Sequence, residues 1–240
     1  MDKGQRLWTV PAACFALCCA LDIFGCMTHG GIGRLVKPAL MPLLSVATLA
    51  WLAERGIASR RSAAMLLCAQ LFGFGGDTLL LGRGDACFAG GLVLFLIGHL
   101  FYICLFGRKS LKGLKPAHIA AGIASGIIVT ALLVLAIGIK GTMLVPMSIY
   151  GFTLMMLVFC TFSGALRFGA SWWMPFCGAV LFCFSDSLIA IGRFGELGRF
   201  MKDFMLMFTY LLAQTLLALG GAGLAAPGGD FAESEQEGIR

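Results

Sequence analysis

Eight stretches of the chain are long and apolar enough to cross a lipid bilayer, and this feature limits the fold more than any other. An α-helix needs about 20 predominantly apolar residues to span the hydrocarbon layer. The stretches are continuous apolar runs, whereas the strands of a membrane β-barrel alternate in polarity over about 10 residues. The eight stretches lie at roughly 7–27, 36–53, 63–82, 87–106, 117–139, 143–162, 172–192 and 203–225. We therefore predict an all-α integral membrane protein with eight transmembrane helices.

The scarcity of charge supports this prediction. Of the 240 residues, 12% are charged and 59% are hydrophobic, whereas about 25% of the residues of a soluble domain are charged. This composition argues against a soluble enzyme, a disordered chain and a nucleic-acid partner. We expect residues 1–226 to form one membrane domain. The last segment, 227–240, is acidic and poor in apolar residues, and we expect it to be a disordered tail.

The lysines and arginines predict the orientation in the membrane. Eight spans place both termini on the same side, where 11 of these residues fall, against 7 on the opposite side. The loop at 107–116 contributes most, with four basic residues. Because positive charge gathers in cytoplasmic loops, we expect both termini to be cytosolic. The same asymmetry accounts for the net charge of +6.

Ionisable side chains within the predicted spans indicate a functional site. Each costs at least about 2.5–3.5 kcal/mol to insert at the bilayer centre, so each needs a reason to be there. At a rise of 1.5 Å per residue, most of these residues and their polar neighbours share a layer roughly 10 Å thick, which predicts one cavity that opens toward the non-cytosolic side. The ionisable residues are Asp22, Lys37, Asp77, His99 and Asp186, and the polar neighbours are Tyr102, Tyr150, Ser185, Thr209, Tyr210 and Gln214.

Several of these residues have structural alternatives. Asp22 could bond a neighbouring helix without any role in chemistry, and Lys37 could extend its ammonium group to the membrane surface. His99 could be a packing residue. A metal site needs three or four ligands, and three histidines at different depths argue against a zinc site. A mixed aspartate and histidine site is a less favoured alternative.

Two segments of the chain resemble each other. The sequence GDTLL at 76–80 is similar to SDSLI at 185–189, and each is preceded by phenylalanines and followed by a turn and another span. Internal repeats are common in membrane proteins, and sites tend to form where the repeats meet. A four-plus-four internal repeat is one interpretation of this similarity.

Five short motifs, taken in order, resemble the YhhN-like lysoplasmalogenase family. The resemblance extends over about residues 36–216 and implies an eight-span enzyme. Such an enzyme cleaves the vinyl ether bond of a lysoplasmalogen to give a fatty aldehyde and glycerophosphoethanolamine or glycerophosphocholine. The resemblance also implies a bacterial inner membrane or the endoplasmic reticulum as the location. The motifs are VKPAL at 36–40, GDTLL at 76–80, GHLFY at 98–102, FSDSL at 184–188 and TYLLAQ at 209–214.

The chemistry of the polar layer fits this resemblance. Hydrolysis of a vinyl ether begins with protonation at carbon and forms an oxocarbenium ion that water captures. It needs one protonated acid and one ionised carboxylate, as in glycosidases, and two carboxyl groups in a low-dielectric pocket can divide in this way. We assign these roles to Asp77 and Asp186, without a choice of which is the acid.

The other polar residues receive supporting roles in this hypothesis. Lys37 would meet the substrate phosphate. The lipid would enter laterally from the bilayer, and a lysophospholipid and membrane lipids are the only partners that we expect. No cofactor and no metal are needed. The residues expected to orient the carboxyl groups or the water are Asp22, His99, Tyr102, Tyr150, Ser185, Tyr210 and Gln214.

Two other functions are compatible with the same residues. Intramembrane aspartate and histidine also form the proton relays of transporters, which often have helices broken at mid-span. Pro146 and Pro175 lie near predicted span ends, and Pro38 and Pro42 lie together at one entry, so this signature is poor. A structural or lipid-sensing protein is favoured only if both aspartates are dispensable.

Overall fold

The computed structural model describes residues 6–28, 31–194 and 199–227, with side chains from residue 203 onward in the last range. Within these ranges the chain forms eight α-helices and a short 3₁₀ turn, Gly141–Met143, without a strand. All eight helices are long and apolar enough to cross a membrane, which confirms the predicted fold class. They are α1 (Thr9–Thr28), α2 (Ile32–Arg55), α3 (Arg60–Leu80), α4 (Asp85–Ser110), α5 (Pro116–Ile137), α6 (Leu144–Phe168), α7 (Ala170–Phe194) and α8 (Arg199–Ala225).

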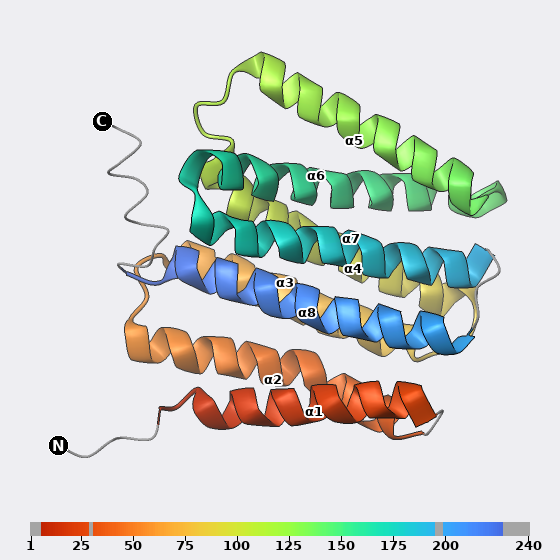
Figure 1. Ribbon diagram of the computed structural model, residues 1–240, viewed down its shortest axis with the longest axis horizontal. Coiled ribbons are helices and arrows are strands. Elements are labelled where there is room, and N and C mark those ends of the chain that lie inside the picture. The colour runs from red at the N-terminus through yellow and green to blue at the C-terminus, as the bar shows by residue number, and fades with distance from the viewer. Residues whose placement is uncertain (1–5, 29–30, 195–198, 228–240) are drawn as a thin grey trace.

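The helices form one bundle in which α1 and α5 lie at opposite edges (Figure 1). Helix α1 packs against α2 and α8, and α5 packs mainly against α6. Between them, α3, α4, α6, α7 and α8 contact one another in the centre. The beginning of α1 and the end of α8 lie at the same end of the bundle (Figure 1). We call this the 111–115 end, after the α4–α5 connection, and the opposite one the 81–84 end, after the α3–α4 connection.

Local sequence signals set several helix ends. The side chain of Ser59 accepts a hydrogen bond from the backbone nitrogen of Ser62 and caps the start of α3, as serine commonly does. Pro116 occupies the first turn of α5, where a missing N–H has no cost. Gly138 ends α5 with a φ of +77°, a conformation that favours glycine.

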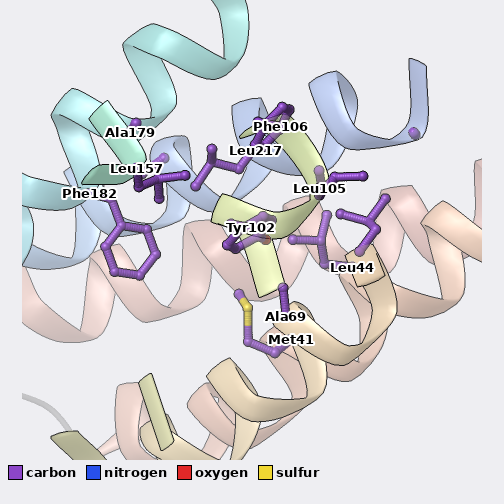
Figure 2. Close-up of a cluster of buried hydrophobic side chains, with 14 of the residues drawn as sticks. Met41, Leu44, Ala69, Tyr102, Leu105, Phe106, Leu157, Ala179, Phe182 and Leu217 are labelled. Carbon is purple, nitrogen blue, oxygen red and sulfur yellow. The ribbon is translucent and has the colours of Figure 1, made fainter. Parts of the chain in front are cut away.

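The core of the bundle contains aromatic and aliphatic side chains from seven helices, all except α5, and Figure 2 shows part of it. Leu157 of α6 and Leu217 of α8 have no exposed surface. Tyr102 of α4 lies among them with its ring stacked on Phe106 at 6.2 Å. The stabilisation of roughly 25 cal/mol per Å² of buried apolar surface holds for surface that is removed from water. Within a bilayer the core therefore stabilises the fold mainly through close packing.

Small residues allow the edge helix α5 to approach α6. A Cβ atom on Gly122 would lie 2.4 Å from the ring of Phe159, and one on Gly126 would lie 2.5 Å from Met156. These glycines form the packing motif that small residues separated by three positions make in membranes. The other face of α5 exposes Ile127, Ile128, Leu132 and Leu135, as a helix in contact with lipid would.

The protein is a multi-pass membrane protein by the length and composition of its helices. The cytosolic location of the termini and the internal repeat stay predictions. The predicted domain boundary at 226 also stays a prediction, and residues 228–240 of the predicted tail lie outside the described residues.

Candidate functional site

Asp77 and Tyr210 form the first of two buried pairs near the 81–84 end. The Tyr210 hydroxyl of α8 donates a hydrogen bond of 2.6 Å to Oδ2 of Asp77 on α3. Asp77 is 3% exposed and Tyr210 is 3% exposed. Next to Asp77, Gly76 leaves room for the ring of Phe95, which would lie 2.7 Å from a Cβ atom at that position. Glycine therefore lets α4 pack close to the carboxyl group.

The first pair continues into a chain of hydrogen bonds that joins three helices. Gln214 lies one turn beyond Tyr210 on the same face of α8, and its Nε2 donates to the Tyr210 hydroxyl at 3.4 Å. The Tyr102 hydroxyl of α4 donates to Oε1 of Gln214 at 3.0 Å. All three side chains are buried. This series of hydrogen bonds holds the Tyr210 hydroxyl in the orientation in which it donates to Asp77.

Asp186 and Tyr150 form the second pair, on α7 and α6. The Tyr150 hydroxyl donates to Oδ2 of Asp186. Oδ1 of Asp186 is buried and has no hydrogen-bond partner among the described residues. A buried polar atom usually has a partner, so an unpartnered oxygen is a group that can receive a water molecule or a substrate atom.

Aromatic rings join the two pairs. The ring of Phe182 lies 5.5 Å from that of Tyr210 and 4.5 Å from that of His99, in edge-to-face contacts. The His99 ring in turn lies 5.5 Å from that of Tyr150. The ring of Phe95 also contacts those of Phe182 and Tyr210, at 6.4 and 6.3 Å. The two pairs therefore belong to one buried site.

His99 packs against aromatic rings within this site. It is 1% exposed, and its Nδ1 atom has no partner among the described residues. Its neighbours in space are the rings of Phe182 and Tyr150. Its contact with Tyr150 places it beside the second pair, in a position to orient that pair through packing.

Two small cavities reach Asp186. One, of about 40 Å³, lies between α5, α6 and α7, and its mainly apolar wall includes Met147 and the hydroxyl-bearing Thr130. The other, of about 20 Å³, is lined by residues of α3, α4, α6 and α7. Tyr150 lines both cavities. Since a water molecule needs roughly 10–15 Å³ of such space, each cavity has room for water beside the Asp186 carboxyl group.

Asp22 and Lys37 lie at the edge of the site, on α1 and α2. Asp22 is buried against α2, with Oδ1 3.2 Å from the position that a Cβ atom on Gly33 would take. Its Oδ2 has no partner among the described residues. Lys37 is half-buried and interacts electrostatically with both Asp22 and Asp77. Among the described residues, Lys37 is the cation that contributes to the electrostatic environment of Asp77.

Ser185 has a different environment from its neighbour Asp186. Its hydroxyl donates to the backbone carbonyl of Leu206 at 3.3 Å and so joins α7 to α8. Sequence reasoning also missed a buried contact in which Gln70 of α3 donates to Thr48 of α2 at 3.3 Å. The sequence contains a signal for this contact, because a glutamine within an apolar span needs a hydrogen-bond partner.

Other residues of the site carry no signal in the sequence. Phe95 and Phe182 are two of many phenylalanines, and Thr130 is a small residue in an apolar span. Only the packing of the helices shows that they surround the aspartates. Among the described residues, no group of three or more histidine, cysteine, aspartate or glutamate side chains is arranged to hold a metal ion.

Comparison with known proteins identifies the chain's relatives. Human lysoplasmalogenase TMEM86A is 26% identical over 179 residues, which are 69% of this chain and 68% of the relative. The bovine TMEM86A lysoplasmalogenase is 26% identical over 183 residues, 71% and 70% of the two chains. The rat lysoplasmalogenase TMEM86B is 30% identical over 151 residues, 60% and 58% of the two chains. No solved structure shows a significant match.

The family model covers nearly all of the site. The model of the YhhN family matches residues 33–221. This range includes both aspartate–tyrosine pairs, His99 and Lys37, whereas Asp22 precedes it. It also contains every motif on which the sequence resemblance was based. The chain therefore belongs to the YhhN family.

Proposed function

We propose that this protein is a lysoplasmalogenase that hydrolyses the vinyl ether bond of lysoplasmalogens with Asp77 and Asp186. The observation that carries the proposal is the presence of two buried carboxyl groups, each bonded to a tyrosine, in one site that contacting aromatic rings join. The relatives that are named lysoplasmalogenases support the same reaction. Products would be a fatty aldehyde and a glycerophospho-alcohol.

Asp186 is the general acid in this proposal. Its surroundings are apolar cavities and aromatic rings, and Tyr150 is its hydrogen-bond donor. Apolar surroundings disfavour an ionised carboxylate and therefore favour the protonated form that an acid needs. Its Oδ1 accepts no hydrogen bond from the described residues. This oxygen would carry the proton that is delivered to the substrate.

Asp77 is the ionised partner. It accepts a hydrogen bond from Tyr210 and has the positive charge of Lys37 within electrostatic range. A hydrogen-bond donor and a nearby cation both favour the charged form of a carboxyl group. Asp77 would stabilise the oxocarbenium ion and accept a proton from the attacking water, a division of roles known from other two-carboxylate sites.

The reaction then balances with one water molecule. Asp186 gives its proton to the vinyl carbon that is not bonded to oxygen, and the other carbon becomes part of the oxocarbenium ion. Water attacks that carbon and loses a proton to Asp77. The hemiacetal releases the glycerol oxygen as an alcohol and leaves the aldehyde. Transfer of one proton from Asp77 to Asp186 restores the starting state, and no step needs a cofactor.

Carbon protonation can be tested directly. The purified protein in detergent should release aldehyde from a lysoplasmalogen and none from the matched alkyl-ether lysolipid, which has no double bond to protonate. In deuterated water, the aldehyde should carry one solvent-derived deuterium at the carbon next to the carbonyl. Release from both lipids, or an aldehyde without deuterium, would contradict the proposed mechanism.

The same assay separates hydrolysis from transport. A hydrolase keeps its activity in detergent, whereas a transporter needs a sealed membrane. The structure offers no specific support for transport: α2 is assigned as one continuous helix through Pro38 and Pro42, and so is α7 through Pro175. Aldehyde release in detergent would therefore favour the hydrolase over the transporter that the intramembrane aspartates also suggest.

A further inference from the structure

A second polar cavity lies at the 111–115 end of the bundle, away from the aspartates. It has a volume of about 460 Å³ and lies between the start of α3, the end of α4 and the end of α8. Arg108, Lys109 and Lys112 line it together with the hydroxyl-bearing Ser59 and Ser62. No aspartate or glutamate is among the described residues that line it.

The lining has the chemistry of a phosphate site. Arg108 and Lys112 are exposed, so their charged groups can reach a ligand in the cavity. Lys109 also lines the cavity, and its ammonium lies 5.2 Å from the centre of the Phe168 ring. Charge-assisted hydrogen bonds from arginine and lysine are the strong contacts to phosphate, and serine hydroxyls add neutral donors. Basic pockets between helices on the cytoplasmic side bind anionic headgroups in other membrane proteins.

We propose that this cavity binds a phosphate group, either on the headgroup of an anionic phospholipid or on a soluble phosphate ester. The proposal gives the basic residues of the α4–α5 region a role beyond setting the orientation in the membrane. It does not depend on the proposed hydrolysis, because it rests on a separate set of side chains.

The separation of the two sites shows that one substrate molecule cannot fill both. Ser62 and Asp77 lie on the same helix, α3, and are 15 residues apart. At 1.5 Å per residue this places them about 22 Å apart along the helix axis. In a lysoplasmalogen only the three carbons of glycerol separate the vinyl ether from the phosphate. A substrate with its vinyl ether at the aspartates therefore leaves the basic cavity for a second ligand.

The test measures binding to the purified full-length protein in detergent by isothermal titration calorimetry. The probes are inorganic phosphate, glycerol 3-phosphate and dioleoylphosphatidylglycerol. The double variant Arg108→Gln/Lys112→Gln should bind about tenfold more weakly. The matched control, Arg60→Gln/Arg61→Gln, removes the same charge at the same end of the bundle from residues that do not line the cavity, and it should bind within about twofold of the unchanged protein.

A third variant keeps the test independent of folding. Ser62→Asp places a carboxylate in the cavity while adding a negative charge to the first turn of α3, where it favours the helix. Its melting temperature should stay near that of the unchanged protein, and its phosphate binding should fall. Binding of all three probes supports a general phosphate site, and binding of the lipid alone identifies a headgroup site. Absence of binding, or equal loss in the Arg60/Arg61 control, would overturn the proposal.

Discussion

The two aspartate–tyrosine pairs look alike in sequence but have different surroundings. Asp77 is held by Tyr210, and through it by Gln214 and Tyr102, and it has Lys37 nearby. Asp186 has Tyr150 as its donor and borders two cavities. In the proposed mechanism, the polar surroundings favour an ionised Asp77 and the apolar surroundings a protonated Asp186. The comparison teaches that two aspartates with similar sequence contexts can have different neighbours, and the proposed roles rest on that difference.

The difference has a simple origin in the helices that supply the tyrosines. Tyr210 and Gln214 are four residues apart on α8, so both side chains lie on one face and can bond in series. Tyr150 lies on α6, where the neighbouring edge helix α5 leaves a cavity. One tyrosine is therefore held by further polar groups, and the other by apolar packing.

Removal of either carboxyl group should give the largest loss of activity. We expect Asp186→Asn and Asp77→Asn each to lower aldehyde release by about 10²–10⁴-fold, the range typical of general acid–base groups. The matched control is Asp85→Asn, at an exposed aspartate that pairs with Arg193, and it should retain near-normal turnover. If either site variant is folded and keeps normal kcat, that aspartate has no part in the chemistry.

The tyrosines test the difference between the pairs more directly. Tyr210→Phe should lower kcat by about 10–100-fold, because hydrogen bonds to charged groups contribute about 1.5–3 kcal/mol. Tyr150→Phe should lower it by only about 2–10-fold, because a bond to a neutral acid contributes about 0.5–1.5 kcal/mol. Stopped aldehyde assays on both folded variants give the ratio. The reverse order would exchange the roles of Asp77 and Asp186.

The sequence was sufficient to predict the fold because bilayer thickness limits the helix length. All eight expected stretches became helices, and the ends differ by a few residues where caps such as Ser59 extend the helix beyond the apolar run. The helix α4, for example, continues to Ser110, past the predicted end at 106. An apolar pattern shows which residues of a helix lie in the hydrocarbon layer. It does not show that α4 continues into the basic turn that follows.

The sequence could predict the candidate site only where a polar residue lies within an apolar span. Asp77, Tyr210 and Gln214 were expected to share a layer, and the structure joins them through hydrogen bonds. The pairing of Asp186 with Tyr150 depends on how α6 packs against α7, which no spacing within one helix specifies. Nor does any sequence pattern show that Thr130 lines the cavity beside Asp186, because a threonine in a span is also an ordinary packing residue.

Lys37 should affect binding more than chemistry if it meets the substrate phosphate. We expect Lys37→Gln to raise KM by about tenfold, since one charge-assisted bond is lost, and to change kcat little, since a contact equal in ground and transition states alters KM alone. Arg34→Gln, at an exposed residue of the same helix, should leave both constants unchanged. A fall in kcat with constant KM would instead mean that Lys37 acts through Asp77.

A small effect should come from the cavity that distinguishes Asp186 from Asp77. Thr130 lines it from α5, and Thr130→Phe would fill part of its volume of about 40 Å³. We expect a loss of about three- to tenfold for long-chain lysoplasmalogens and a smaller loss for short ones, because only a long hydrocarbon chain would extend through this space toward the bilayer. Thr130→Val removes the hydroxyl without adding volume, and its rate of aldehyde release should be near normal.

Overpacking can cost about 1–3 kcal/mol of stability, so melting temperatures of both variants are measured together with the kinetics. An equal loss at every chain length would show that the substrate reaches Asp186 from another side, and the apolar cavity would then explain the state of the acid but not the path of the lipid.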